Sequence, residues 1–305
     1  EPELTLSGIL PVLPTPFDRT GAVDVPAMGA LVRFALAAGV DGLVFPGFAS
    51  EVESLDAHER AVLLAAVVTA AGGRVPVIAG ASAETPDAVA DHGRRAAELG
   101  VRFAMVQPPK AIGGGAEPVA AFMAAVAARL PAMALVLQNA PAPRGADLSP
   151  EAILAVLARV PAIRYVKEET LPCGQHVTRI LAATGGRLDG VLGGAGARFV
   201  LDELARGASG TMPALEIADA HAALWAAWQH GDRAEARRIY TLTLPLLASQ
   251  MVFRVRTTKE VLRRRGLLSH TAARAGGPAL DAGDLDELGA LLASAAPAMT
   301  IHPPR

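Results

Sequence analysis

The run Ile163-Arg164-Tyr165-Val166-Lys167 is largely apolar and partly β-branched, and a helical pattern follows it over residues 175–184. This pair predicts a buried strand with a covering helix. Similar pairs recur from residue 9 to about residue 230. The expected strands lie at 9–13, 42–45, 75–79, 103–106, 133–137, 163–167, 188–192 and 210–212, and the expected helices at 25–38, 56–71, 85–99, 117–129, 149–159, 175–184, 198–206 and 217–230. Eight strands, each followed by a helix, predict an α/β fold, the (β/α)8 TIM barrel.

Past residue 231 the strand pattern ends, and helical patterns remain at 232–248, 257–265 and 284–293. We expect three short, weakly capped helices that pack on the barrel or on a neighbouring subunit. The predicted organisation is a catalytic barrel domain over residues 1–230 and a C-terminal helical region over residues 231–305. In such barrels the chemistry takes place at the carboxyl ends of the strands.

The composition narrows the class of protein. The 305 residues are 51% hydrophobic and 19% charged, with a formal charge of −2, which excludes a disordered chain, a collagen-like fibre and a strongly cationic nucleic-acid binder. Apolar runs stay below the roughly 18 residues of a membrane span, and Glu1-Pro2-Glu3 shows no secretory pattern. The single cysteine, Cys173, excludes an internal disulfide. We therefore expect a cytoplasmic protein without membrane or nucleic-acid partners.

Lysine is scarce in this chain. Only Lys110, Lys167 and Lys259 occur, and the other 25 of the 28 basic residues are arginines. Lys167 ends the sixth expected strand, and Tyr165 and Glu169 share its face because side chains alternate along a strand. A desolvated amine there loses its proton easily and attacks a ketone to form a Schiff base; the alternative is a solvated Lys–Glu pair at the rim.

The other two lysines have plainer expectations. Lys110 follows Pro108-Pro109 after the fourth expected strand, where it is either a pocket residue or an exposed loop lysine. Lys259 lies in a helical pattern crowded with arginines, which predicts a solvated helix face or a subunit contact.

Six motifs follow one another in a characteristic order. They are Pro14-Thr15-Pro16-Phe17, Gly47-Phe48-Ala49-Ser50-Glu51, Val75-Pro76-Val77-Ile78-Ala79-Gly80, Gln138-Asn139-Ala140-Pro141, Val166-Lys167-Glu168 and Gly207-Ala208-Ser209-Gly210. Together they resemble the dihydrodipicolinate synthase / N-acetylneuraminate lyase family of Schiff-base barrels. The resemblance covers most of the chain and implies that Lys167 forms the Schiff base, that the substrate is a small 2-oxo acid, and that the protein is a homotetramer without a cofactor.

The chain departs from the family pattern at several positions, among them Pro108-Pro109-Lys110, where the second tyrosine of the family's P-Y-Y stretch is absent. Gln138 stands where the family has a proton-relay tyrosine, and Phe48 and Ala49 replace two threonines. An amide does not titrate, so Gln138 orients a group or a water molecule. Among subfamilies, the chain is most similar to the 2-keto-3-deoxy-L-arabonate dehydratases, which have Q-D-A-P at the tyrosine position. Asn139 replaces the acid of that motif, which leaves the sugar-acid specificity open.

The resemblance and the strand pattern together predict the site residues. Lys167 is the nucleophile, with Glu169, Ser50 and Tyr165 as the proton relay; the alternatives are a rim charge for Glu169, a turn residue for Ser50 and a packing residue for Tyr165. The substrate-binding set is Gln138, Ala49, Phe48, Gly194 in a glycine-rich pocket wall, and Arg144, which is expected to meet the substrate carboxylate. Glu51 is expected to hold its loop through backbone N–H groups. The seven histidines are scattered without ligand spacing, so no metal site is expected.

Three functions remain open at this point. The first is dehydration of a 2-keto-3-deoxy sugar acid through an enamine on Lys167, and the second is retro-aldol cleavage of the same intermediate, which releases pyruvate. The third is a non-catalytic 2-oxo acid-binding barrel that has lost the tyrosine and the threonines.

Overall fold

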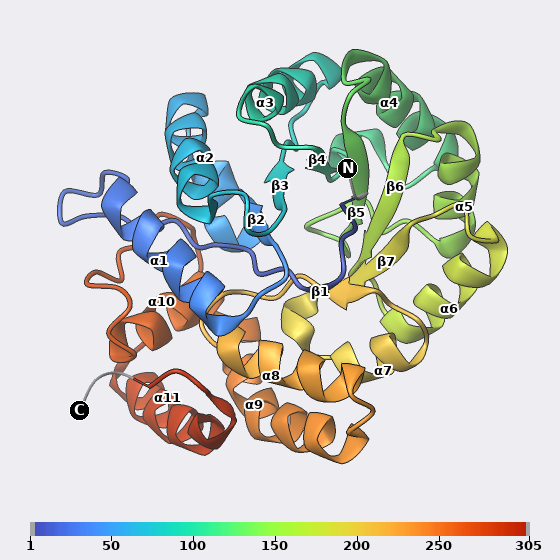
Figure 1. Ribbon diagram of the computed structural model, residues 1–305. Coiled ribbons are helices and arrows are strands. Elements are labelled where there is room, and N and C mark those ends of the chain that lie inside the picture. The colour runs from blue at the N-terminus through green and yellow to red at the C-terminus, as the bar shows by residue number, and fades with distance from the viewer. Residues whose placement is uncertain (1–3, 303–305) are drawn as a thin grey trace.

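Eight parallel strands curl into a ring that is surrounded by helices (Figure 1). The computed structural model describes residues 4–302, so the sequence expectation for Glu1-Pro2-Glu3 lies outside the described residues. The strands are β1 Gly8–Ile9, β2 Leu43–Phe45, β3 Val77–Gly80, β4 Phe103–Val106, β5 Ala134–Asn139, β6 Ile163–Glu168, β7 Gly190–Gly193 and β8 Gly210–Thr211. The helices are α1 Val25–Ala38, α2 Ala57–Ala71, α3 Pro86–Glu98, α4 Ala116–Arg129, α5 Pro150–Arg159, α6 Cys173–Thr184, α7 Val200–Ala205, α8 Ala218–Gln229, α9 Arg233–Phe253, α10 Val255–Arg264 and α11 Ala282–Ala295. The predicted barrel is therefore confirmed.

The ring closes between its first and second strands through Val12, just past β1. The ladder runs in the order β1-β8-β7-β6-β5-β4-β3-β2, and Val12 adds parallel bridges to Val44 and to Ala214. Alternate side chains point inward, where they form a packed interior that includes Val136 and Tyr165. The opposite set packs under the helices and forms the larger core. This alternation sends Lys167 toward the barrel interior and Glu168 outward.

The helix boundaries follow from the capping residues. The Thr85 and Ser149 hydroxyls accept hydrogen bonds from Ala88 N and Ala152 N, and each is followed by proline at the first helical position. Gly39 ends α1 with φ 83°, a left-handed conformation in which glycine avoids the Cβ clash.

The C-terminal helices pack on the barrel, and the expectation of short, weakly capped helices holds only for α10, which has 10 residues and no side-chain cap. Helix α9 has 21 residues; it continues through Pro245 and ends at Phe253, beyond the expected end at 248. Asp232 caps α9, and Asp281 forms a capping box with Asp284 at the start of α11. Helix α9 packs against α8, and α10 and α11 pack against α9. The division into domains at residue 231 stays a prediction.

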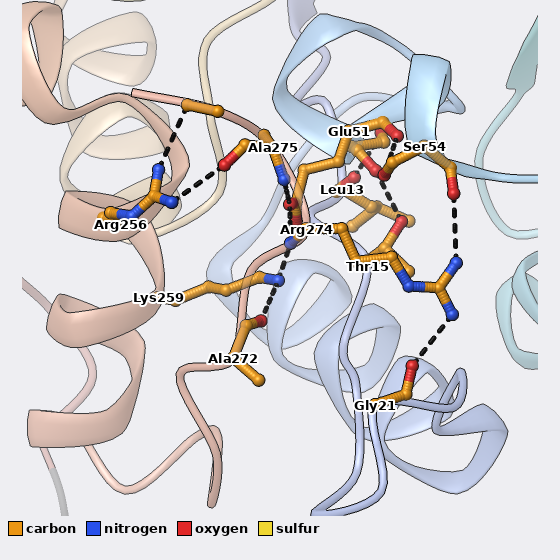
Figure 2. A network of polar contacts seen from close by, with 12 residues as sticks. Leu13, Thr15, Gly21, Glu51, Ser54, Arg256, Lys259, Ala272, Arg274 and Ala275 are labelled. Carbon is orange, nitrogen blue, oxygen red and sulfur yellow. Dashed lines mark hydrogen bonds and ion pairs between the residues drawn. The ribbon is translucent and has the colours of Figure 1, made fainter. Parts of the chain in front are cut away.

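A buried ion pair joins α10 to the loop that follows β2, and hydrogen bonds to the same two side chains hold the segment after α10 (Figure 2). The ammonium of Lys259 lies 2.6 Å from Oε2 of Glu51 and donates to the carbonyl of Ala272 at 2.6 Å. The other carboxylate oxygen of Glu51 accepts hydrogen bonds from the backbone N–H groups of Arg274 and Ala275, both at 2.7 Å. We call this set the Lys259–Glu51 clasp.

The clasp corrects one expectation and confirms another. The Lys259 side chain is 0% exposed, so the predicted solvated face or subunit contact is wrong. The neighbouring arginines suggested solvent, whereas the partner of Lys259 lies 208 residues away in sequence. Glu51 does bind backbone N–H groups, as expected, and they belong to the distant segment 274–275. Glu51 directly follows the short 3-10 helix Phe48–Ser50, so the clasp also holds two predicted substrate-binding residues in place.

We predict that Lys259→Met destabilises the protein by about 3–5 kcal/mol, because the Glu51 carboxylate is left buried without its cation. The double variant Glu51→Gln/Lys259→Met should recover part of this loss, and Lys110→Met, at an exposed lysine, should change nothing. Urea unfolding measures all three free energies. A Lys259→Met variant as stable as the parent protein would contradict the clasp.

Candidate active site

Lys167 lies at the carboxyl end of β6, between two neighbouring strands. In the sheet register its partners are Gln138 on β5 and Leu192 on β7. The Lys167 side chain is buried, with 4% of the residue exposed. Its ammonium nitrogen lies 3.6 Å from Oε1 of Glu169, which follows β6 on the same face. The rim-pair alternative required solvent around both groups, and the burial of both excludes it.

Glu169 collects hydrogen-bond donors from three other directions. Gln138 donates its amide N–H to Oε2 at 3.0 Å, and Arg144 donates to the same oxygen at 3.2 Å. The backbone N–H of Ala195 approaches Oε1 at 3.5 Å. A Cβ on Gly194 would lie 2.6 Å from Oε1, so the absence of a side chain there lets the carboxylate occupy this place. Four of the predicted site residues thus meet around one carboxylate.

Burial and neighbouring charges tune the two groups of this ion pair. Burial lowers the pKa of the Lys167 amine, Glu169 opposes this, and the charge of Arg144 lowers the pKa further. Burial alone would raise the pKa of Glu169, but Lys167 and Arg144 outweigh it and bring this pKa to about 2. Glu169 is therefore ionised near neutral pH, while the amine loses its proton more easily than an exposed lysine does.

An aromatic ring flanked by two arginines forms the wall beside this pair. The guanidinium carbon of Arg144 lies 4.6 Å from the centroid of the Phe48 ring, and that of Arg254 lies 5.7 Å from the same centroid. Ala49 packs against the interior side chains of the barrel. Arg254, which the sequence interpretation missed, comes from the junction of α9 and α10.

The structure places the two predicted relay hydroxyls in different surroundings from the amine. Ser50 is fully buried; its hydroxyl contacts the carbonyl of Leu13 and accepts from Gly47 N at 2.9 Å. The Tyr165 hydroxyl accepts from Leu6 N at 3.0 Å, among apolar side chains of the barrel interior. Leu6 precedes β1, so this hydroxyl is directed away from the carboxyl ends of the strands. Both contacts are those of turn and packing residues.

A second group of acids lies behind β6 and β7, outside the barrel interior. Asn139 donates to Glu168 at 3.0 Å and to the carbonyl of Leu148 at 2.9 Å, so it anchors the following loop. Burial raises the pKa of Glu168 to about 7 and that of Glu203 to about 8. Neither carboxylate oxygen of Glu203 has a hydrogen-bond partner among the described residues. These acids were not predicted, because only the tertiary packing of α7 on Gly193 removes Glu203 from water.

Among residues 4–302, no group of three or more His, Cys, Asp or Glu side chains is arranged to hold a metal ion. In the same part of the chain, every helix is too short or too polar to cross a membrane.

Comparisons of this chain with known proteins point to one family. The model of the dihydrodipicolinate synthetase family matches residues 5–295. An L-2-keto-3-deoxyarabonate dehydratase of Azospirillum brasilense is 29% identical over 271 residues, which are 88% of this chain and 87% of that protein. A 4-hydroxy-tetrahydrodipicolinate synthase of Xylella fastidiosa is 38% identical over 165 residues, 54% of each chain.

The solved structures agree with the sequence relatives. A crystal structure of dihydrodipicolinate synthase from Rhodopseudomonas palustris superposes with a TM-score of 0.88 at 25% identity, and the match covers 96% of this chain and all of that one. The family match spans both the barrel and the helices that follow it. The chain therefore belongs to the dihydrodipicolinate synthetase family and is a lyase of that family.

Proposed function

We propose that the protein is a Schiff-base lyase that removes water from a 2-keto-3-deoxy sugar acid. The observation that carries this proposal is the buried Lys167 amine at the carboxyl end of β6, held 3.6 Å from Glu169 with its pKa lowered by burial. An arginine cannot replace Lys167, because a guanidinium stays protonated and forms no imine.

The chemistry uses only the chain, the substrate and water. The neutral Lys167 amine adds to the C2 carbonyl, and uptake of one proton from solvent with loss of one water leaves an iminium cation. Removal of a C3 proton gives the enamine, whose electron pair expels the C4 hydroxyl as a second water once that hydroxyl is protonated. Loss of a C5 proton gives a dienol, and protons return to C3 and C4 as the C5 hydroxyl becomes a carbonyl. One water then hydrolyses the iminium, which releases the Lys167 amine, a proton and a 2,5-dioxo acid; this product is a semialdehyde where C5 is the terminal carbon. The iminium is the electron sink, so the scheme needs no cofactor.

Arg144 controls the protonation of Glu169 in this scheme. In the free protein Arg144 and Lys167 hold the pKa of Glu169 at about 2, too low for an efficient base near neutral pH. The incoming substrate carboxylate competes for the Arg144 guanidinium. When Arg144 turns to the substrate, Glu169 loses one of its cations and becomes more basic, next to the iminium carbon. Glu169 then accepts the C3 proton and returns it to the leaving hydroxyl.

The relative from Azospirillum brasilense supports dehydration over aldol cleavage, since its name is that of a dehydratase and it aligns over 88% of this chain. Gln138 supports the same choice, because it fills the relay-tyrosine position with an amide that orients Glu169. The family resemblance also leads us to propose a homotetramer, and the single cysteine a cytoplasmic location.

The pH dependence of kcat/KM should report the Lys167 amine. Activity should rise with pH as Lys167 loses its proton, with a midpoint below the ordinary lysine value of 10.5. Glu169→Gln removes the charge that raises the pKa of Lys167, so the midpoint should move to lower pH, with a loss of kcat of about 100-fold. Arg144→Gln removes a charge that lowers this pKa, so its midpoint should move to higher pH. If Glu169→Gln and Arg144→Gln both shifted the midpoint in the same direction, Lys167 would be excluded as the titrating group.

The reaction type is tested by its products. A panel of 2-keto-3-deoxy sugar acids is incubated with the protein, and NMR identifies either a 2,5-dioxo acid, which is a semialdehyde for a five-carbon substrate, or pyruvate. We expect the 2,5-dioxo acid from the parent protein, none from Lys167→Ala, and unchanged turnover from Lys110→Ala. Pyruvate as the main product would establish the aldolase instead, and binding without turnover would establish the non-catalytic barrel.

A further inference from the structure

The carboxyl-end opening of the barrel holds more positive than negative charge. Arg144 bonds directly to Glu169, and two further arginines lie within electrostatic reach of the same carboxylate. Burial and the charge of Arg254 lower the pKa of Arg198, while Glu169 raises it. Burial and Arg144 lower the pKa of Arg254, and Glu169 again acts in the opposite direction. Arg144 and the Lys167 amine therefore contact the Glu169 carboxylate, and Arg198 and Arg254 interact with it electrostatically.

Arg254 is an exposed residue, and it is the arginine of this group whose guanidinium donates to no other described residue. Among residues 4–302, no carboxylate or carbonyl accepts a hydrogen bond from its guanidinium. Its contact is the face of Phe48, 5.7 Å from the ring centroid, and that ring is 44% exposed. Arg198, by comparison, donates to the carbonyl of Leu247 at 3.3 Å. A planar guanidinium held over a ring keeps its N–H edge available for a bidentate anion.

The backbone at Arg254 is unusual for a residue with a side chain. It has φ 54° and ψ −126° at the junction of α9 and α10, a region that glycine adopts far more easily. The conformation is held by the Arg254 N–H, which donates to the carbonyl of Gln250 at 2.7 Å. Strained positions of this kind concentrate at functional sites, where the side chain has a use that offsets the strain.

A 2-oxo acid has one carboxylate, and in the proposed function this carboxylate binds Arg144. Arg198 and Arg254 then remain without a counter-charge. We propose that the substrate carries a second anionic group, a carboxylate or a phosphate ester, at the end far from its keto acid, and that Arg254 binds this group across the face of Phe48. Arg198 adds to the positive field. The inference rests on the proposed function and narrows its substrate class from sugar acids in general to dianionic ones.

The position of the wall fits this assignment. Arg144 and Arg254 lie over the same ring, but they come from the loop after β5 and from the start of α10. The barrel therefore holds the keto acid end of the substrate, and the C-terminal helices supply the group that selects its far end.

The test compares three six-carbon 2-keto-3-deoxy acids that differ only at C6, which ends in a hydroxymethyl group, a carboxylate or a phosphate ester. At low ionic strength, kcat/KM should be about 10-fold or more higher for at least one anionic acid than for the neutral-ended one. The preference should shrink as salt is added, because an exposed charge pair is screened. The anionic acid with the higher kcat/KM shows whether the second group is a carboxylate or a phosphate ester. Equal values for all three acids would overturn the proposal.

Variants assign the preference to a residue. Arg254→Gln should abolish it, and Arg254→Lys, which keeps the charge, should retain part of it. The matched control is Arg237→Gln, which removes the same charge about 25 Å away along α9 and should leave the preference intact. A full preference in Arg254→Gln would overturn the assignment to Arg254.

A binding experiment separates this inference from the proposed chemistry. The probes are 2-oxoglutarate and 2-oxovalerate, which have equal chain lengths and differ in the terminal carboxylate. Borohydride trapping of both to equal extents would leave the Schiff base intact and overturn the anion site. If neither acid is trapped, the Schiff base is contradicted, and calorimetry then tests the anion site separately. Tighter binding of 2-oxoglutarate than of 2-oxovalerate would support the anion site, and equal affinities would overturn it.

Discussion

A lysine amine kept out of water beside a carboxylate governs the whole site. Burial makes the charged form of Lys167 costly, and Glu169 keeps that cost low enough for the chain to fold. In the proposed reaction the same carboxylate balances the charge of the iminium, because the positive charge stays at the same nitrogen. Arg144 and Gln138, as partners of Glu169, set how strongly it holds the ammonium. The site is therefore an electrostatic balance around one carboxylate rather than a chain of hydroxyl relays.

Local patterns were sufficient to predict the barrel. Strand β4 and helix α1 have the predicted bounds, since alternation, helix periodicity and capping residues act over a few neighbours. The face shared by Lys167 and Glu169 also follows from alternation alone. Tyr165 shares that face, but it lies two residues deeper, and no local signal showed that its hydroxyl binds Leu6 N.

Contacts between distant segments explain what the sequence did not predict. The partner of Lys259 is Glu51, 208 residues away, and the neighbouring arginines suggested an exposed helix instead. Arg254 reaches Phe48 from a backbone conformation that no residue pattern around it announces. In both cases the C-terminal helices contact the segment after β2. These helices thus complete the site wall as well as covering the barrel.

Reductive trapping detects the proposed Schiff base at Lys167 itself. The protein is incubated with pyruvate and borohydride, and mass spectrometry of the intact chain and its peptides locates the adduct. We expect one reduced pyruvate on Lys167 and none in Lys167→Ala, even though Lys110 is more exposed. An unmodified chain, or an adduct that persists in Lys167→Ala, would contradict this expectation.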